Sequence, residues 1–86
     1  MPKLRKNASL KAIALHTVRK VRLCRQEIRR LLEAEDYSRP NDRLVRELHA
    51  KRLEKMSEAI EWAKVAAQLC RHAGIEFPKE LSHYAE

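Results

Sequence analysis

The chain has 86 residues, 36% of them charged, and a formal net charge of +7; this length leaves room for one domain and no second core. Leu and Ala supply 11 residues each, whereas there are only one Gly, three Pro and eight Val and Ile residues in all, a composition typical of helices. No apolar run approaches the roughly 20 residues that cross a bilayer, so we expect no membrane span, and the basic N-terminus lacks the apolar stretch of a signal peptide.

A first long helix is predicted over residues 8–35, after a basic tail at residues 1–6. Asn7 and Ser9 are both candidate N-caps, because their side-chain oxygens can accept hydrogen bonds from the free amides of a first turn. Apolar or small side chains then recur at steps of three and four, the spacing of a helix that buries one line of residues against another helix. These residues are Leu10, Ala14, Thr17, Val21, Cys24, Ile28 and Leu31.

A second long helix is predicted over residues 40–73. Proline keeps the residue before it out of helical geometry, so Pro40 fits the first position of this helix. Gly74 fits the left-handed residue that ends a helix, with Ile75 folding back on Cys70. The predicted buried line of this helix consists of Val45, Leu48, Leu53, Met56, Ile60, Ala63, Ala67 and Cys70. Its regular spacing is interrupted between Leu48 and Leu53.

Two helices joined by a turn of a few residues pack antiparallel. The fold class predicted is therefore an all-α hairpin of two long helices, with Cys24 facing Leu53 across the interface. The C-terminal segment, residues 75–86, contains Pro78, which could start one short third helix.

Two helices cannot enclose a core, and the second helix carries a further apolar stripe beside its buried line. This stripe consists of Trp62, Val65 and Leu69. An apolar stripe of this kind needs to be covered by other residues. Three candidates could cover it: residues 75–86, a second copy of the chain, or a foreign partner. We expect a homodimer that forms a helical bundle.

Charge is unevenly placed along the chain: residues 1–30 hold ten bases and one acid, and residues 31–86 hold nine bases and eleven acids. Arginines spaced three and four apart on one outer helix face can bridge successive phosphates or grip carboxylates. The alternative is a solvated face neutralised by nearby acids. The predicted polyanion-binding residues are Lys11, Arg19, Arg22, Arg25, Arg29 and Arg30.

These features predict a non-enzymatic binding module, foremost a nucleic-acid-binding accessory or regulatory protein. The alternative is a small protein-binding regulator or inhibitor that docks on an acidic surface of a larger complex. Base-specific recognition is not supported, because none of the four aromatic residues interleaves with the basic positions and both helices are too long for a helix-turn-helix motif. Binding to a membrane surface ranks third, since the apolar line of the first helix is committed to the second helix.

We find no pattern for catalysis or for a cofactor. The four histidines do not converge, and Cys24 with His49 would supply too few ligands for a metal ion. A thiol in a buried line is normally inert, and one glycine cannot build a phosphate loop. We therefore expect no enzyme activity, metal or small-molecule substrate. Two cysteines without a secretion signal predict a cytoplasmic location, with no disulfide between Cys24 and Cys70.

Overall fold

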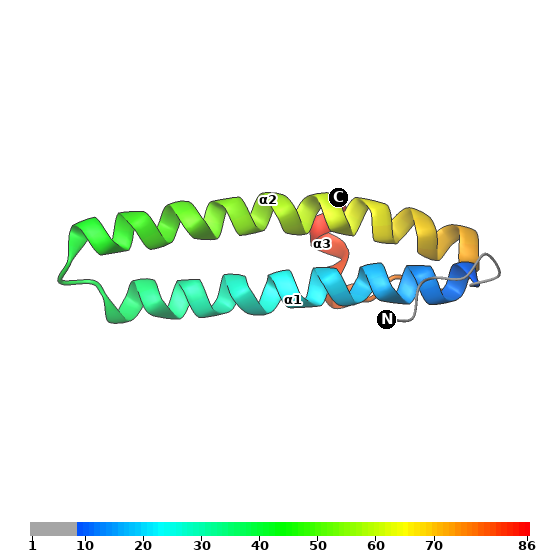
Figure 1. The fold of residues 1–86 in the computed structure, drawn as a ribbon, viewed down its shortest axis with the longest axis horizontal. Coiled ribbons are helices and arrows are strands. Elements are labelled where there is room, and N and C mark those ends of the chain that lie inside the picture. Colours follow the sequence, from blue (N-terminus) through cyan, green and yellow to red (C-terminus); the bar gives the residue numbers. More distant parts are fainter. Residues whose placement is uncertain (1–8) are drawn as a thin grey trace, which may run out of the picture.

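The computed structural model describes residues 9–86, in which two long antiparallel helices lie side by side and a short C-terminal segment folds back against them (Figure 1). Helix α1 spans Leu10–Tyr37 and helix α2 spans Asp42–Ala73. A single 3₁₀ turn at Lys79–Leu81 leads into the short helix α3, Ser82–Ala85. The predicted all-helical hairpin with a short third helix is confirmed, whereas the basic tail at residues 1–6 lies outside the described residues.

Helix α1 begins where its sequence offers a side-chain acceptor. The Ser9 hydroxyl accepts a hydrogen bond from the amide three residues along, at 3.1 Å, so Ser9 is the N-cap. The other candidate, Asn7, lies outside the described residues. The helix ends at Tyr37, two residues beyond the predicted limit, because nothing before the turn interrupts its hydrogen bonds.

Helix α2 begins at a different residue from the one predicted. The Asn41 side chain accepts a hydrogen bond from a first-turn amide at 3.1 Å and caps the helix, so placing Pro40 at the first helical position was wrong. The helix ends as predicted at Gly74, which has a left-handed φ of 71°. The Ile75 amide donates to the Cys70 carbonyl at 2.9 Å and closes the last turn.

The buried line of α1 is the predicted one from Ala14 to Cys24, and Leu10 at its start is exposed. The buried line of α2 differs from the prediction, because it keeps regular steps of three and four and passes through Arg52. Near the turn its members are half-buried, and these are Val45, Leu48, Arg52 and Met56. Farther along they are buried, and these are Ala59, Ala63, Ala66 and Cys70. The predicted members Leu53 and Ile60 are exposed, Leu53 by 49%, so the expected pairing of Cys24 with Leu53 is wrong.

Small side chains dominate the interface between α1 and α2. Four alanines have no exposed surface, which lets the backbones approach closely but buries little apolar area per residue. They are Ala14, Ala59, Ala63 and Ala66. The largest fully buried side chain is Leu81, which lies outside the hairpin, in the C-terminal segment.

The C-terminal segment completes the core. Leu81 and Tyr84 are buried, and Ile75 and Phe77 pack against the same cluster of buried residues. Helix α3 contacts α2, and Glu80 in the preceding turn forms an ion pair with Arg22 of α1, so the segment touches both long helices. It is therefore a third layer that covers one side of the hairpin.

Replacing Leu81 by Ala should therefore destabilise the protein far more than replacing Leu53 by Ala. Leu81 is fully buried, and a buried Leu→Ala change costs about 2–5 kcal/mol, whereas a surface change costs about 0.5 kcal/mol or less. Urea unfolding followed by circular dichroism measures both. Equal losses for the two variants would contradict this burial pattern and restore the predicted line through Leu53.

Candidate functional site

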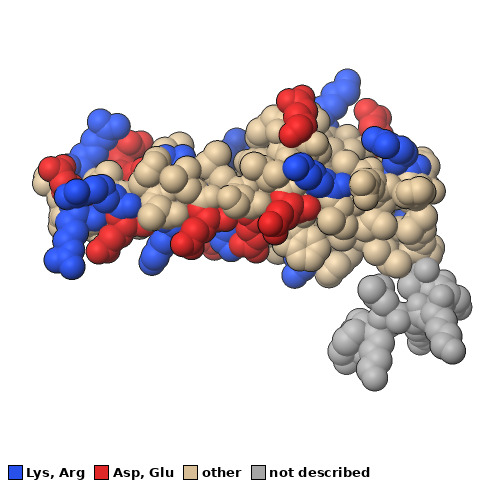
Figure 2. Space-filling model, turned by 90° about the horizontal axis from the view of Figure 1, so that it is seen from above, with Lys and Arg blue, Asp and Glu red and all other residues tan. Residues whose placement is uncertain are grey.

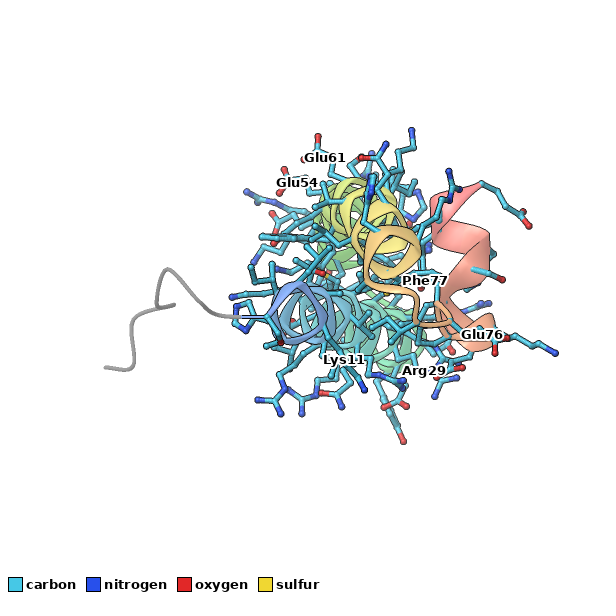
Figure 3. All side chains as sticks on the ribbon, turned by 90° about the vertical axis from the view of Figure 1, so that its right-hand side faces the viewer. Lys11, Arg29, Glu54, Glu61, Glu76 and Phe77 are labelled. Atoms are coloured by element: carbon cyan, nitrogen blue, oxygen red, sulfur yellow. The ribbon has the colours of Figure 1, made fainter. Side chains whose placement is uncertain are left out.

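Basic side chains gather along α1, which carries seven Lys and Arg residues against four Asp and Glu residues. Five exposed bases of α1 form the basic face: Lys11, Arg19, Arg22, Arg29 and Arg30. Viewed end-on, Lys11 and Arg29 lie on the same side of α1 and point away from α2 (Figure 3). At 1.5 Å per residue these two positions are about 27 Å apart along the helix.

Three members of the basic face lie on one line. Lys11 and Arg22 are separated by about three helical turns, and Arg22 and Arg29 by about two, so all three project from α1 in nearly the same direction. Such a line presents its charges to one straight partner. Among residues 9–86, the only base of α1 in an ion pair is the middle residue of this line, Arg22.

Arg22 and Arg25 were both expected to be exposed and free of acidic partners, but Arg22 is paired and Arg25 is not exposed. Arg22 Nη1 donates to Glu80 Oε1 at 2.8 Å, and Arg25 is half-buried. A backbone hydrogen bond at Glu80 holds the pKa of this carboxyl below its ordinary value, and the charges of Arg22 and Arg25 lower it further. Both differences arise because the C-terminal segment folds onto this side of α1.

The outer face of α2 is electrically mixed, in contrast to that of α1. Seen over α2, acidic and basic side chains both occur along the molecule, with several acidic ones together near its middle (Figure 2). Lys55 Nζ lies 3.1 Å from a carboxylate oxygen of Glu58, and Arg43 Nε lies 3.6 Å from one of Glu47. With seven bases and five acids, α2 has nearly the same net charge as α1, but its charges of both signs lie together. In α1 the seven bases all lie before residue 31, where Glu27 is the one acid, so uncompensated positive charge gathers on that part of the helix.

A partly buried ion pair joins the two helices near the turn. Arg52, on the buried line of α2, donates to both carboxylate oxygens of Glu35, which is itself buried on α1. Arg52 Nη2 also lies 2.8 Å from His49 Nδ1, which can accept only when that nitrogen carries no proton. Hydrogen bonding from Arg52 lowers the pKa of the Glu35 carboxyl, and the positive charge of Arg52 acts in the same direction.

A groove runs along the side of the hairpin that carries Trp62. It is lined by Lys20, Leu23, Cys24, Gln26, Glu27, Arg30, Lys55, Glu58 and Trp62, with no residue from the C-terminal segment. At about 100° per residue, Lys20 and Glu27 lie on the side of α1 opposite to Arg25, so the groove and the C-terminal segment occupy opposite sides. Figure 3 shows α3 on one side of the two long helices.

The predicted self-association stripe borders this groove and is partly exposed. Val65 is 46% exposed, and Leu23 across the groove is 50% exposed. Trp62 and Leu69 are half-buried against the core. The C-terminal segment therefore covers one side of the hairpin and leaves this stripe open to solvent at Val65.

The two cysteines lie inside the described part of the chain, and His49 lies at the edge of the ion pair. Cys24 and Cys70 are both free and buried, and burial raises the pKa of each thiol, which keeps the neutral, weakly nucleophilic form. His49 faces Glu35 and Arg52. Within residues 9–86, no three His, Cys, Asp or Glu side chains gather closely enough to hold a metal ion, and no helix has the length and apolar character to span a membrane.

Comparison with known proteins adds no family: no protein-family model matches the chain, and neither the curated proteins nor the solved structures contain a match.

The Glu35–Arg52 pair should make stability depend on pH. Because the folded-state pKa of Glu35 is lowered, its contribution is fully present above the unfolded-state value of about 4.3 and is lost as the pH falls through the folded-state value. Glu35→Gln should thus lower the urea midpoint at neutral pH, and the difference from wild type should shrink in acid. Glu33→Gln, at an exposed position on the same helix, is the control. A gap that stays constant from neutral pH into acid would contradict the assignment.

Proposed function

We propose that this protein is a non-enzymatic binding module whose basic face holds a nucleic acid by its backbone phosphates. One observation carries the proposal: Lys11, Arg19, Arg29 and Arg30 are exposed on α1 and have no acidic partner within 4.0 Å among the described residues. An uncompensated row of Arg and Lys attracts polyanions and releases their counterions on binding. A cytoplasmic location, where thiols remain reduced, fits both this partner and the free cysteines.

Contacts to phosphates rather than to bases follow from the placement of the aromatic residues. Trp62 and Phe77 pack against the core, and Tyr84 is buried in the C-terminal segment. Tyr37 is exposed, but it lies at the far end of α1, beyond the basic face. The basic face therefore has no aromatic side chain on which a nucleobase could stack. Binding would depend on the shape and charge of the nucleic acid and would be insensitive to its nucleotide sequence.

A second candidate partner is an acidic protein surface. The observation that favours it is Leu15, which lies on α1 between Lys11 and Arg19 and is 54% exposed. A phosphate backbone has no apolar surface that could cover an exposed leucine. A protein interface could bury this leucine between pairs of opposite charges. The protein would then act as a regulator or inhibitor of a larger complex.

Reversing three charges of the basic face should remove binding and leave the fold intact. The variant Lys11→Glu, Arg19→Glu, Arg29→Glu lowers the net charge from +7 to +1 at positions that are exposed and unpaired. We expect the affinity for a labelled DNA or RNA duplex to fall at least tenfold, as measured by fluorescence anisotropy at low salt. The circular dichroism spectrum should be unchanged.

The matched control reverses three exposed bases of α2: Arg46→Glu, Lys51→Glu and Lys64→Glu. Both triple variants have the same net charge, so only the location differs. If the two lose affinity equally, attraction is a matter of overall charge and the basic face has no special role. If wild type binds neither duplex but captures one protein from a lysate after nuclease treatment, the second candidate replaces the first.

We also propose that the stripe Trp62, Val65 and Leu69 binds the same stripe of a second copy. The neighbouring groove supports this occupant, because its walls carry bases and acids together, Lys20 and Lys55 with Glu27 and Glu58. In a two-fold interface each patch meets itself, so a mixed rim can place bases opposite acids. A polyanion would instead meet the two carboxylates.

Val65→Glu should convert a dimer into a monomer of unchanged helicity. Val65 is already 46% exposed, so the charge costs the isolated chain little and would be buried only in the dimer. Leu15→Glu, at the outer surface of α1, is the control that should remain dimeric. Sedimentation at several concentrations measures both; a wild-type chain that is monomeric throughout would refute self-association.

A further inference from the structure

Glu80 brings a carboxylate of the chain itself onto the basic face. Its Oε1 accepts from Arg22 Nη1 at 2.8 Å, across 58 residues of sequence. Arg22 is the middle residue of the line Lys11, Arg22, Arg29, so the ion pair interrupts that line at its centre. The half-buried Arg25 contributes a second positive charge that acts on the same carboxyl.

A carboxylate at this place occupies one of the donors that a phosphate would use and neutralises part of the charge that would attract it. A guanidinium presents its N–H groups in a planar fork that suits carboxylate and phosphate oxygens alike. Arg22 donates to Glu80 through Nη1, and a phosphate that approached its other N–H groups would lie beside the Glu80 carboxylate and be repelled by its negative charge. A nucleic acid lying along α1 would therefore have to displace Glu80 or give up one contact.

We propose that Glu80 is an internal competitor that occupies Arg22 and lowers the affinity of the basic face for a phosphate polyanion. This inference rests on the proposed function. The contact is suited to exchange, because the Arg22 and Glu80 side chains are 51% and 43% exposed, and exposed ion pairs are weak. The backbone that carries Glu80 stays in place, because the adjoining Leu81 is fully buried.

The Arg22–Glu80 pair could instead serve only to hold the C-terminal segment against α1. This alternative predicts a different outcome. A pair that only fastens the C-terminal segment would change stability and leave binding untouched. A competitor changes affinity and, since one more phosphate contact releases about one more counterion, changes the salt dependence as well. The two roles are therefore separable by a binding measurement.

The test compares Glu80→Gln with Glu76→Gln. Glu76 belongs to the same segment (Figure 3), is exposed and has no ion pair among the described residues. Both variants therefore gain one unit of charge, and only Glu80→Gln releases Arg22. The probe is a fluorescently labelled DNA duplex of mixed sequence, titrated at several salt concentrations. Urea unfolding of both variants checks that the segment remains folded.

We expect Glu80→Gln to bind about two- to fivefold more tightly than wild type, the range that corresponds to an exposed ion pair. The slope of log affinity against log salt should become steeper by about 0.9. Glu76→Gln should leave the slope unchanged. In a protein that already carries Arg22→Gln, adding Glu80→Gln should give no further gain, because the competition has no target.

The possible failures are distinguishable. If wild type binds the duplex and the two Gln variants have the same affinity and slope, Glu80 is not a competitor, and the proposed function stands. If Glu80→Gln tightens binding equally with Arg22→Gln present, the gain is general electrostatics and the inference is overturned. If neither wild type nor Glu80→Gln binds DNA or RNA, the proposed function fails and the inference fails with it.

Discussion

A pair of helices can bury only the line of side chains along which they touch, and every other feature of this fold follows from that constraint. At one end the line is filled by alanines, which bring α1 and α2 close together but remove little apolar surface from water. Near the turn it contains an ion pair, Glu35 with Arg52, instead of a layer of apolar contact. The hairpin therefore depends on the residues after Gly74, and above all on Leu81, for its largest buried side chain.

Local pattern determined what could be predicted from the sequence. The buried line of α1 and the left-handed Gly74 were predictable, because regular spacing and a glycine after the last turn are signals carried by neighbouring residues. The line of α2 was not, because it runs through Arg52, and a charge in a buried line is tolerated only with a distant partner. Glu35 provides that partner from the other helix, and the sequence pattern of α2 alone does not contain it.

The same division applies to the candidate site. Helical periodicity was enough to predict that Lys11, Arg19 and Arg29 are exposed, since each position follows from its spacing to the buried line. It could not show that Glu80 lies beside Arg22, because that contact spans 58 residues and depends on how the C-terminal segment folds back. Three exposed bases were thus readable from local spacing, whereas the one acid that neutralises part of the face required the tertiary structure.

The hairpin has two unlike sides, and this asymmetry connects the three proposals. The C-terminal segment and Glu80 occupy one side, the Trp62 groove opens on the other, and Lys11 and Arg29 point away from α2. Two copies joined through the groove would keep both C-terminal segments outside the interface. Each copy would then offer a line of bases to the same polyanion, and binding by the second copy would become intramolecular, which raises affinity without a new contact. Weak individual contacts, including one that Glu80 interrupts, would be sufficient in such an assembly.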